Sequence, residues 1–503
     1  MAEPILEVLL DDTLSVEQVE AVALGAPLRL GALARARMDE GVGWWEAHGD
    51  PHILRSKWEL LMGGAAPGDR EEAVKRFLLD HCAGVGEPLS VPVVRALIAC
   101  RAHVLAQGVS GVRPVVVERL LELLATDHIP VVPSVGPVGA AGSSALAHVA
   151  RVALGLGGEV FTAEGRVPSD RPPLEVSEKE ALALINGSSL TAAIGALACS
   201  QAMRLLRSAI AACALSMEVV QADARCLDPR SFVARGHPGG VAVAEALRGL
   251  LDGSELVTPG RSPDAFSIRC APIVLGAAKD ALSHVRDVVE RELSGVSDNP
   301  LVFADGMVEG GHFHGAPVAM ALDHLKVALV QVASIAERRV FRLTYGRLSG
   351  LPSFLVPGTG VNSGLMLAQY TAASLVAEAR GRAVPGSVDS IPTVQHHEDH
   401  VSMGPVAART AIEVVDLVSD VVAIELLTAA QGLDFRLRGE AVDAEGGLTS
   451  GGARAPAPGT RAVYDAVRAR VERWEDDQVL HPDLVAMGEA VRAGVFAERV
   501  PCL

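Results

Sequence analysis

Aromatic residues are scarce in this sequence, and its cysteines form no regular pattern. Aromatic side chains make up 3% of the 503 residues, with only three tyrosines, and the seven cysteines include no CxxC pair. An odd number of scattered cysteines does not fit a disulfide framework or a cysteine-based zinc site. We therefore expect reduced thiols and a cytoplasmic protein.

The chain also lacks an excess of positive charge and a long uncharged apolar run. Its formal net charge is -17, which disfavours nucleic acid and anionic membranes as partners because like charges repel. The most apolar long stretch, residues 190–220, is interrupted by Arg204, Arg207 and Glu218. We interpret it as a buried core helix, since a membrane span needs about 18 uncharged residues.

Helical patterns dominate what is present. Ser15 followed by Gln18 is typical of a capping box at a helix start. Apolar residues at helical spacing predict a helix over 406–431, ending at Gly432. Similar long helices are expected over 188–219, 271–293, 317–340 and 363–380, with short strands near 4–10 and 300–310. These lengths predict a mainly α protein built as a bundle of long helices.

Sequence blocks along residues 75–436 carry a family resemblance. In order they are HCAGVGEPLS from His81, SGVRPVVVERLLELL, KEALALINGSS, AFSIRCAPIVLGA, GVSDNPLVF, GGHFHGAPVAMALDHL, ERRVFRL, LSGLPSFLV, VNSGLMLAQYTAASLVAE, SVDSIPT and EDHVSMG. The chain resembles the histidine and phenylalanine (aromatic amino acid) ammonia-lyases. It is nearest the histidine lyases, because EDHVSMG carries Glu398 where phenylalanine lyases usually have glutamine.

The resemblance implies a long-helix bundle of the ammonia-lyase (fumarase/aspartase-like) type. It also implies a homotetramer whose active sites combine residues from several subunits. We expect residues 1–436 to form the lyase-like helical domain, with 1–180 as its N-terminal part and 181–436 as its central bundle. Residues 437–503 would form a loop and closing helices.

Family members build an electrophile, methylidene-imidazolone, from an Ala-Ser-Gly triplet. The matching residues here are Ala140, Ala141 and Gly142. The alanine at position 141 has no hydroxyl to eliminate, so we expect no such cofactor. A triplet shifted to Gly142-Ser143-Ser144 is an alternative, although it lacks the final glycine.

Two family tyrosines are missing as well. The loop 48–64, which matches the region of the tyrosine base, contains no tyrosine, and Phe266 stands where the family has another. Whether His52 or the altered loop replaces the base is left open by the sequence.

Other pocket positions match the family. The resemblance implies that Arg269 clamps a substrate carboxylate, unless it forms a buried ion pair with Asp264 or Glu398. The remaining expected substrate-binding residues are Asn186, Phe266, Phe313 and His81.

Acid–base groups are expected from Glu398 and from three added histidines, His312, His396 and His397. The HHEDH string would place His396 and His400 on one helical face, a spacing that suits a metal, but we predict no metal site.

The sequence therefore predicts a pocket repurposed for cofactor-free elimination, addition or cyclisation on a small carboxylate-bearing substrate. Two alternatives stay open. One is a catalytically silent homologue that binds a ligand or joins an active paralogue in a mixed oligomer. The other is residual histidine or aromatic amino acid ammonia-lyase activity.

Overall fold

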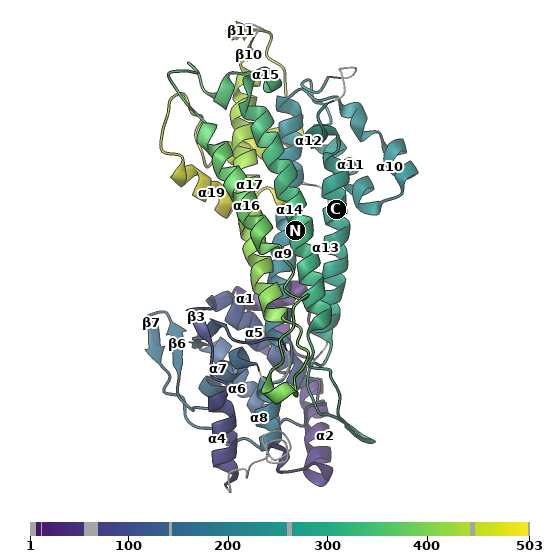
Figure 1. Ribbon diagram of the computed structural model, residues 1–503, viewed down its shortest axis with the longest axis vertical. Helices are drawn as coiled ribbons and strands as arrows, with labels where there is room; N and C mark the ends of the chain where they lie inside the picture. Colours follow the sequence, from purple (N-terminus) through teal and green to yellow (C-terminus); the bar gives the residue numbers. More distant parts are fainter. Residues whose placement is uncertain are drawn as a thin grey trace.

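A computed structural model describes residues 7–11, 13–54, 69–139, 143–258, 264–442 and 448–500. It confirms the mainly α fold. Its bundle is made of helices that pack side by side along the long axis of the molecule (Figure 1). They are α9 (Ser189–Val219), α13 (Ala271–Ser294), α14 (Ala316–Thr344), α16 (Met366–Arg382) and α17 (Gly404–Leu437).

The N-terminal part of the chain packs around the lower end of this bundle in Figure 1. Its helices are α1 (Val16–Ala23), α2 (Ala32–His48), α4 (Arg70–Asp80), α5 (Val91–Ala106), α6 (Pro114–Ala125), α7 (Ser144–Ala153) and α8 (Glu178–Ile185). Its strands are β1 (Val8–Leu9), β2 (Leu28–Arg29), β3 (Val85–Pro88), β4 (Ile129–Pro130), β5 (Pro133–Val135), β6 (Glu159–Thr162) and β7 (Gly165–Pro168). The expected capping box at Ser15 is confirmed, because Ser15 and Gln18 each accept the other's backbone N–H.

Shorter elements surround the rest of the bundle. They are η1 (Ala224–Leu227), α10 (Pro229–Arg235), α11 (Pro238–Leu251), α12 (Phe266–Arg269), β8 (Leu301–Phe303), β9 (Gly306–Val308), α15 (Gly346–Ser349), η2 (Ser353–Leu355), η3 (Val394–His396), β10 (Glu440–Val442), β11 (Leu448–Ser450), α18 (Pro458–Arg468), α19 (His481–Arg492) and η4 (Ala497–Arg499). Strands β8 and β9 pair antiparallel, as expected near residues 300–310.

One predicted boundary is wrong. Gly432 does not end a helix, because α17 continues to Leu437. A Cβ added at Gly432 would lie 2.5 Å from Val219 Cγ1 at the end of α9. This glycine therefore lets α17 approach α9 closely and is not a C-cap.

Within the described residues, two helical stretches are long and apolar enough to cross a membrane, judged by length and composition alone. They are Glu178–Val219 and Ala316–Thr344. The apolar window of the first is entirely buried inside the protein, which confirms the core helix expected there. The second is partly exposed along one side.

Candidate active site

The segment just before the degenerate triplet is fastened to the starts of two long helices. The carbonyl of Gly139 accepts hydrogen bonds from Ser402 Oγ at 2.7 Å and from the Gly315 backbone N–H at 3.3 Å. The Val138 carbonyl accepts from the Met403 N–H at 2.8 Å. Gly139 has φ +85°, and a Cβ there would lie 2.2 Å from Ser402 Oγ. Only glycine fits this junction without displacement.

Four helices begin around this junction. Helix α7 starts at Ser144, directly after the triplet, and α14 and α17 start just beyond Gly315 and Met403. Helix α9 joins them, because Ser188 Cβ lies 3.3 Å from the position of a Cβ added at Gly315. Helix N-termini carry partial positive charge and free N–H groups, so their convergence favours a carboxylate or a developing negative charge.

Asn186 lies at the end of α8 and is hydrogen-bonded to buried groups of other segments. Its Nδ2 donates to the Asn299 carbonyl at 3.0 Å, and its own carbonyl accepts from Arg101. The side chain is 1% exposed, and Oδ1 has no hydrogen-bond partner among the described residues. A buried acceptor without a partner suits a role toward a bound molecule or water.

Glu398 and His81 are close enough to interact electrostatically. Glu398 is half-buried and accepts a hydrogen bond from Thr393 Oγ1 at 2.6 Å. Burial lowers the pKa of His81, but Asp80, the Phe77 carbonyl and Glu398 outweigh it and raise the pKa above its usual value. His81 therefore carries more positive charge near neutral pH than a free histidine does.

The added histidines do not form the arrangement that their spacing suggested. Residues 394–396 have left-handed φ angles of 45°, 52° and 68°, so the HHEDH string is not helical and His396 and His400 share no helical face. His312, His396 and His397 are exposed, and Phe313 is half-buried. Across the described ranges, no group of three or more His, Cys, Asp or Glu side chains is placed to hold a metal.

Arg269 and Phe266 lie at the opposite end of the bundle. Their short helix α12 packs against the far end of α14, where Arg339 donates to the Ser267 carbonyl (Figure 1). The stretch of α14 from Ala316 to Arg339 spans about 35 Å at ~1.5 Å per residue. The expected clamp therefore cannot reach Gly139 of its own chain.

The environment of Arg269 also excludes the ion pair considered as its alternative. Arg269 is exposed and stacks on the ring of Phe266 at 4.8 Å, and Phe266 is 69% exposed. Asp264 accepts the Asp223 backbone N–H instead, and Glu398 lies at the other end. Within one chain, a guanidinium ready to bind a carboxylate is thus left facing outward.

The altered inner loop is only partly described. His52 Nδ1 lies 3.6 Å from the buried carboxylate of Glu178. Residues 55–64 of this loop lie outside the described residues, as do Ala140, Ala141 and Gly142 of the triplet.

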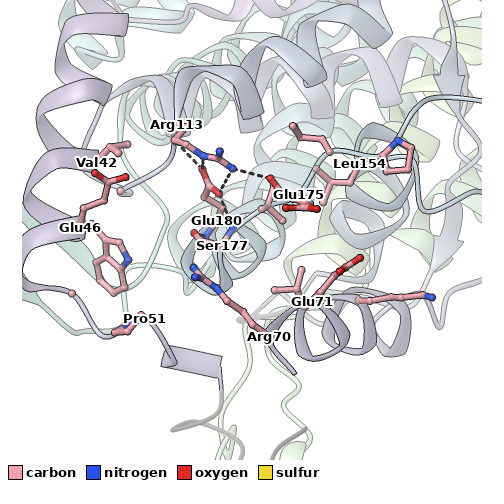
Figure 2. Close-up of a pocket in the computed structure, with 18 of the residues that line it drawn as sticks. Val42, Glu46, Pro51, Arg70, Glu71, Arg113, Leu154, Glu175, Ser177 and Glu180 are labelled. Atoms are coloured by element: carbon pink, nitrogen blue, oxygen red, sulfur yellow. Dashed lines mark hydrogen bonds and ion pairs between the residues drawn. The ribbon is translucent and has the colours of Figure 1, made fainter. Parts of the chain in front are cut away.

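A cavity of about 670 Å³ lies elsewhere, between α2, α4 and the segment before α8 (Figure 2). Its wall holds Arg113, which is bound to Glu180 through two guanidinium nitrogens at 2.7 and 2.9 Å. The cavity reaches the end of α7 at Leu154, about 15 Å along the helix from its start at Ser144. We place the candidate site at the junction around Gly139, because the starts of α14 and α17 meet there.

The residues present do not fit the family's prosthetic group. Forming its methylidene carbon requires a serine hydroxyl as leaving group, and Ala141 has a methyl group instead. In the shifted alternative, Ser143 is buried as the N-cap of α7, and its Oγ accepts from the Leu146 N–H at 3.5 Å. The central residue of that alternative therefore already serves as a helix cap.

Sequence reasoning missed several residues that build this junction, among them His314, Gly315 and Ser402. Ser402 belongs to EDHVSMG, and the other two belong to GGHFHG. Both blocks carry the family resemblance, but their contacts with Gly139 join residues that are far apart in the sequence.

The comparisons with known proteins agree with this geometry. The model of the aromatic amino acid lyase family matches residues 62–469. Histidine ammonia-lyase of Symbiobacterium thermophilum is 44% identical over 86% of this chain and 85% of that protein. Histidine ammonia-lyase of an Anaeromyxobacter species is 42% identical over 97% and 98% of the two chains. The crystal structure of histidine ammonia-lyase from Trypanosoma cruzi has a TM-score of 0.87 at 34% identity, covering 98% of this chain and 94% of that chain.

These relatives correct the functional prediction made from the sequence. Proteins named histidine ammonia-lyase are 41–44% identical to this chain over most of its length. The prediction of a pocket repurposed for cofactor-free chemistry is therefore wrong, and so is the silent alternative. The missing hydroxyl at position 141 and the missing tyrosines suggested a different reaction, whereas most of the chain, including the junction around Gly139, keeps the family's sequence. By the family model and by these relatives, the chain belongs to the aromatic amino acid lyase family.

Proposed function

We propose that this chain is a histidine ammonia-lyase whose turnover is held down by Ala141. The identity of 41–44% to proteins of that name, sustained over most of the chain, is the observation that carries the proposal. Glu398 in EDHVSMG supports histidine rather than phenylalanine as the substrate.

The substrate would bind at the junction of helix starts around Gly139. Its carboxylate and the negative charge that develops during deamination are favoured by the converging N-termini of α7, α9, α14 and α17. Glu398 and His81 would orient the ammonium and imidazole groups by charge and hydrogen bonding. The buried Oδ1 of Asn186 is available as a further acceptor.

Completion of the site would require another copy of the chain. Arg269 of a neighbouring copy would supply the carboxylate clamp, because the arginine of the same chain is about 35 Å away along α14. Large apolar side chains exposed on α14 and α16 support a homotetramer, since they would be covered in it: Met320, Val327, Phe341, Leu367 and Tyr370. We place this assembly in the cytoplasm, in keeping with the scattered unpaired cysteines.

No methylidene-imidazolone is part of this proposal. A site that loses its principal reactive group still accelerates its reaction through binding and preorganised charge. We therefore expect a measurable but low rate of ammonia release.

The test is ammonia and urocanate formation from histidine by the purified full-length chain, compared with phenylalanine and tyrosine. Loss of the signal in Glu398→Gln would assign it to this site. The proposal is abandoned if histidine yields no ammonia above the level of heat-inactivated protein, and ammonia from phenylalanine or tyrosine alone would make the chain an aromatic amino acid lyase instead. The mass of the peptide containing residues 140–142 should equal that of its sequence. A peptide lighter by two waters would mean that the shifted triplet cyclises.

A further inference from the structure

Two imidazole rings from separate elements share a hydrogen bond beside the candidate site. His314 lies just before α14, and His400 lies shortly before α17. His400 Nδ1 and His314 Nε2 are 3.3 Å apart, and the stacked rings have centroids 5.4 Å apart with planes inclined by 24°.

Both rings belong to segments that bind Gly139 directly. The residue after His314 is Gly315, whose N–H donates to the Gly139 carbonyl. Ser402, two residues after His400, donates to the same carbonyl. The pair is therefore tied to the residue that immediately precedes the triplet.

The geometry of the pair permits a proton to pass through it. An N–H···N bond between two imidazoles needs one donor and one acceptor nitrogen, so at least one ring is neutral. The outer nitrogens, His314 Nδ1 and His400 Nε2, have no hydrogen-bond partner in the part of the chain that the structure describes. His314 is half-buried and His400 is exposed, so a small molecule or solvent has access to them. A proton taken at one outer nitrogen shifts the bridging proton, and the other outer nitrogen can release its own.

We infer that the His314–His400 pair carries the β-proton in the proposed lyase reaction. The chain needs such a group, since loop 48–64 contains no tyrosine and Phe266 replaces another family tyrosine. In the balanced reaction the Cβ–H and Cα–N bonds of histidine break and the C=C bond forms. The pair takes the proton from Cβ and returns it to the departing ammonia, which leaves as ammonium. The inference rests on the proposed function.

A second histidine pair in the same chain serves as a matched control. His284 on α13 and His324 on α14 are both exposed, and their ring centroids are 6.0 Å apart at 54°. No hydrogen bond joins these two rings in the described structure. Both pairs thus place imidazoles near α14, but of the two only His314 and His400 are joined by a hydrogen bond in the described structure.

The experiment uses the full-length chain and four variants, His314→Gln, His400→Gln, their double variant and His284→Gln/His324→Gln. Ammonia release from histidine is measured, together with the exchange of histidine Cβ protons for deuterium in D₂O. We expect each single variant of the pair to lower kcat about 100-fold or more with little change in KM, as for loss of a general base. The double variant should be no slower than the singles, because the rings act as one unit. The control variant should keep the parent rate.

The outcomes separate this inference from the proposed function. If ammonia is released but the pair variants keep kcat within threefold, the inference is overturned and the function stands. If no ammonia appears but Cβ exchange depends on His314 and His400, the proposed function is overturned, whereas the transfer of the β-proton by the pair is supported. If neither ammonia nor exchange appears, both are wrong. If a variant unfolds, the ¹⁵N–¹⁵N coupling across the hydrogen bond is measured in the unmutated chain instead. Absence of this coupling also overturns the inference.

Discussion

The two ends of the long-helix bundle differ in how far a single chain completes them. At the lower end in Figure 1, α9, α14 and α17 begin together, and Gly139 is held by Ser402 and Gly315. At the upper end, Arg269 and Phe266 on α12 are exposed and contact each other. The lower end holds the hydrogen-bonded junction around Gly139 but not the arginine expected to bind a carboxylate. The upper end holds Arg269 but not that junction. The proposed assembly would bring the Arg269 of one copy to the Gly139 junction of another.

The largest effect is expected from restoring the serine of the triplet. Ala141→Ser recreates the Ala-Ser-Gly triplet in a frame that is otherwise intact. We expect the peptide containing residues 140–142 to become lighter by two waters. Ammonia release from histidine should rise by about 100-fold or more, the effect typical of a strong electrostatic group in an active site. The measurements are peptide mass and initial rate, with Ala140→Ser as control. An unchanged mass and rate would show that this end is no longer competent for the family chemistry.

The next prediction tests the division of the site between copies. Arg269→Ala should raise KM for histidine by about 10- to 100-fold, because a charged hydrogen bond contributes about 1.5–3 kcal/mol. The exposed Arg230→Ala on α10 is the matched control and should leave KM unchanged. When Arg269→Ala and Glu398→Gln chains are unfolded together and reassembled, part of the activity should return. Such recovery is impossible if both residues serve a site within one chain.

Much of this fold could be predicted from the sequence, because helix starts and lengths are local properties. The capping box at Ser15 and the core helix 189–219 follow from spacing alone. The role of Gly432 could not be predicted, because it depends on Val219, more than two hundred residues away. The same holds for the contact between Ser402 and Gly139 and for the pairing of His400 with His314. The sequence predicts which residues belong to the site, and that prediction stays untested, whereas their distribution over the two ends is a property of the folded chain.

A smaller effect probes how tightly the lower end is built. Gly139→Ala places a Cβ 2.2 Å from Ser402 Oγ at φ +85°, so backbone strain and a clash add. We expect a loss of more than about 2 kcal/mol in the free energy of unfolding, measured by urea denaturation. Gly165→Ala has φ +111° without any atom within 4 Å and should cost only about 1 kcal/mol. Equal losses would mean that the contact with Ser402 contributes nothing beyond backbone strain.

The smallest effect concerns a buried histidine of α5 and shows whether the stability of the whole chain can change without changing the site. Burial, helped by the charge of Arg37, lowers the pKa of His103 in α5 to about 4. The unfolded chain binds a proton near pH 6.5 and the folded chain does not, so stability is present above that pH and is lost as the pH falls toward 4. Between pH 7 and 5.5 we expect a loss of about 1 kcal/mol from this residue. His103→Gln should remove that part of the slope in urea denaturation curves at the two pH values. Because His103 is 1% exposed and contacts neither Gly139 nor Arg269, KM for histidine should stay the same. A changed KM would show that a substitution in the buried part of α5 alters substrate binding. The substrate site would then not be independent of the stability of the surrounding helices.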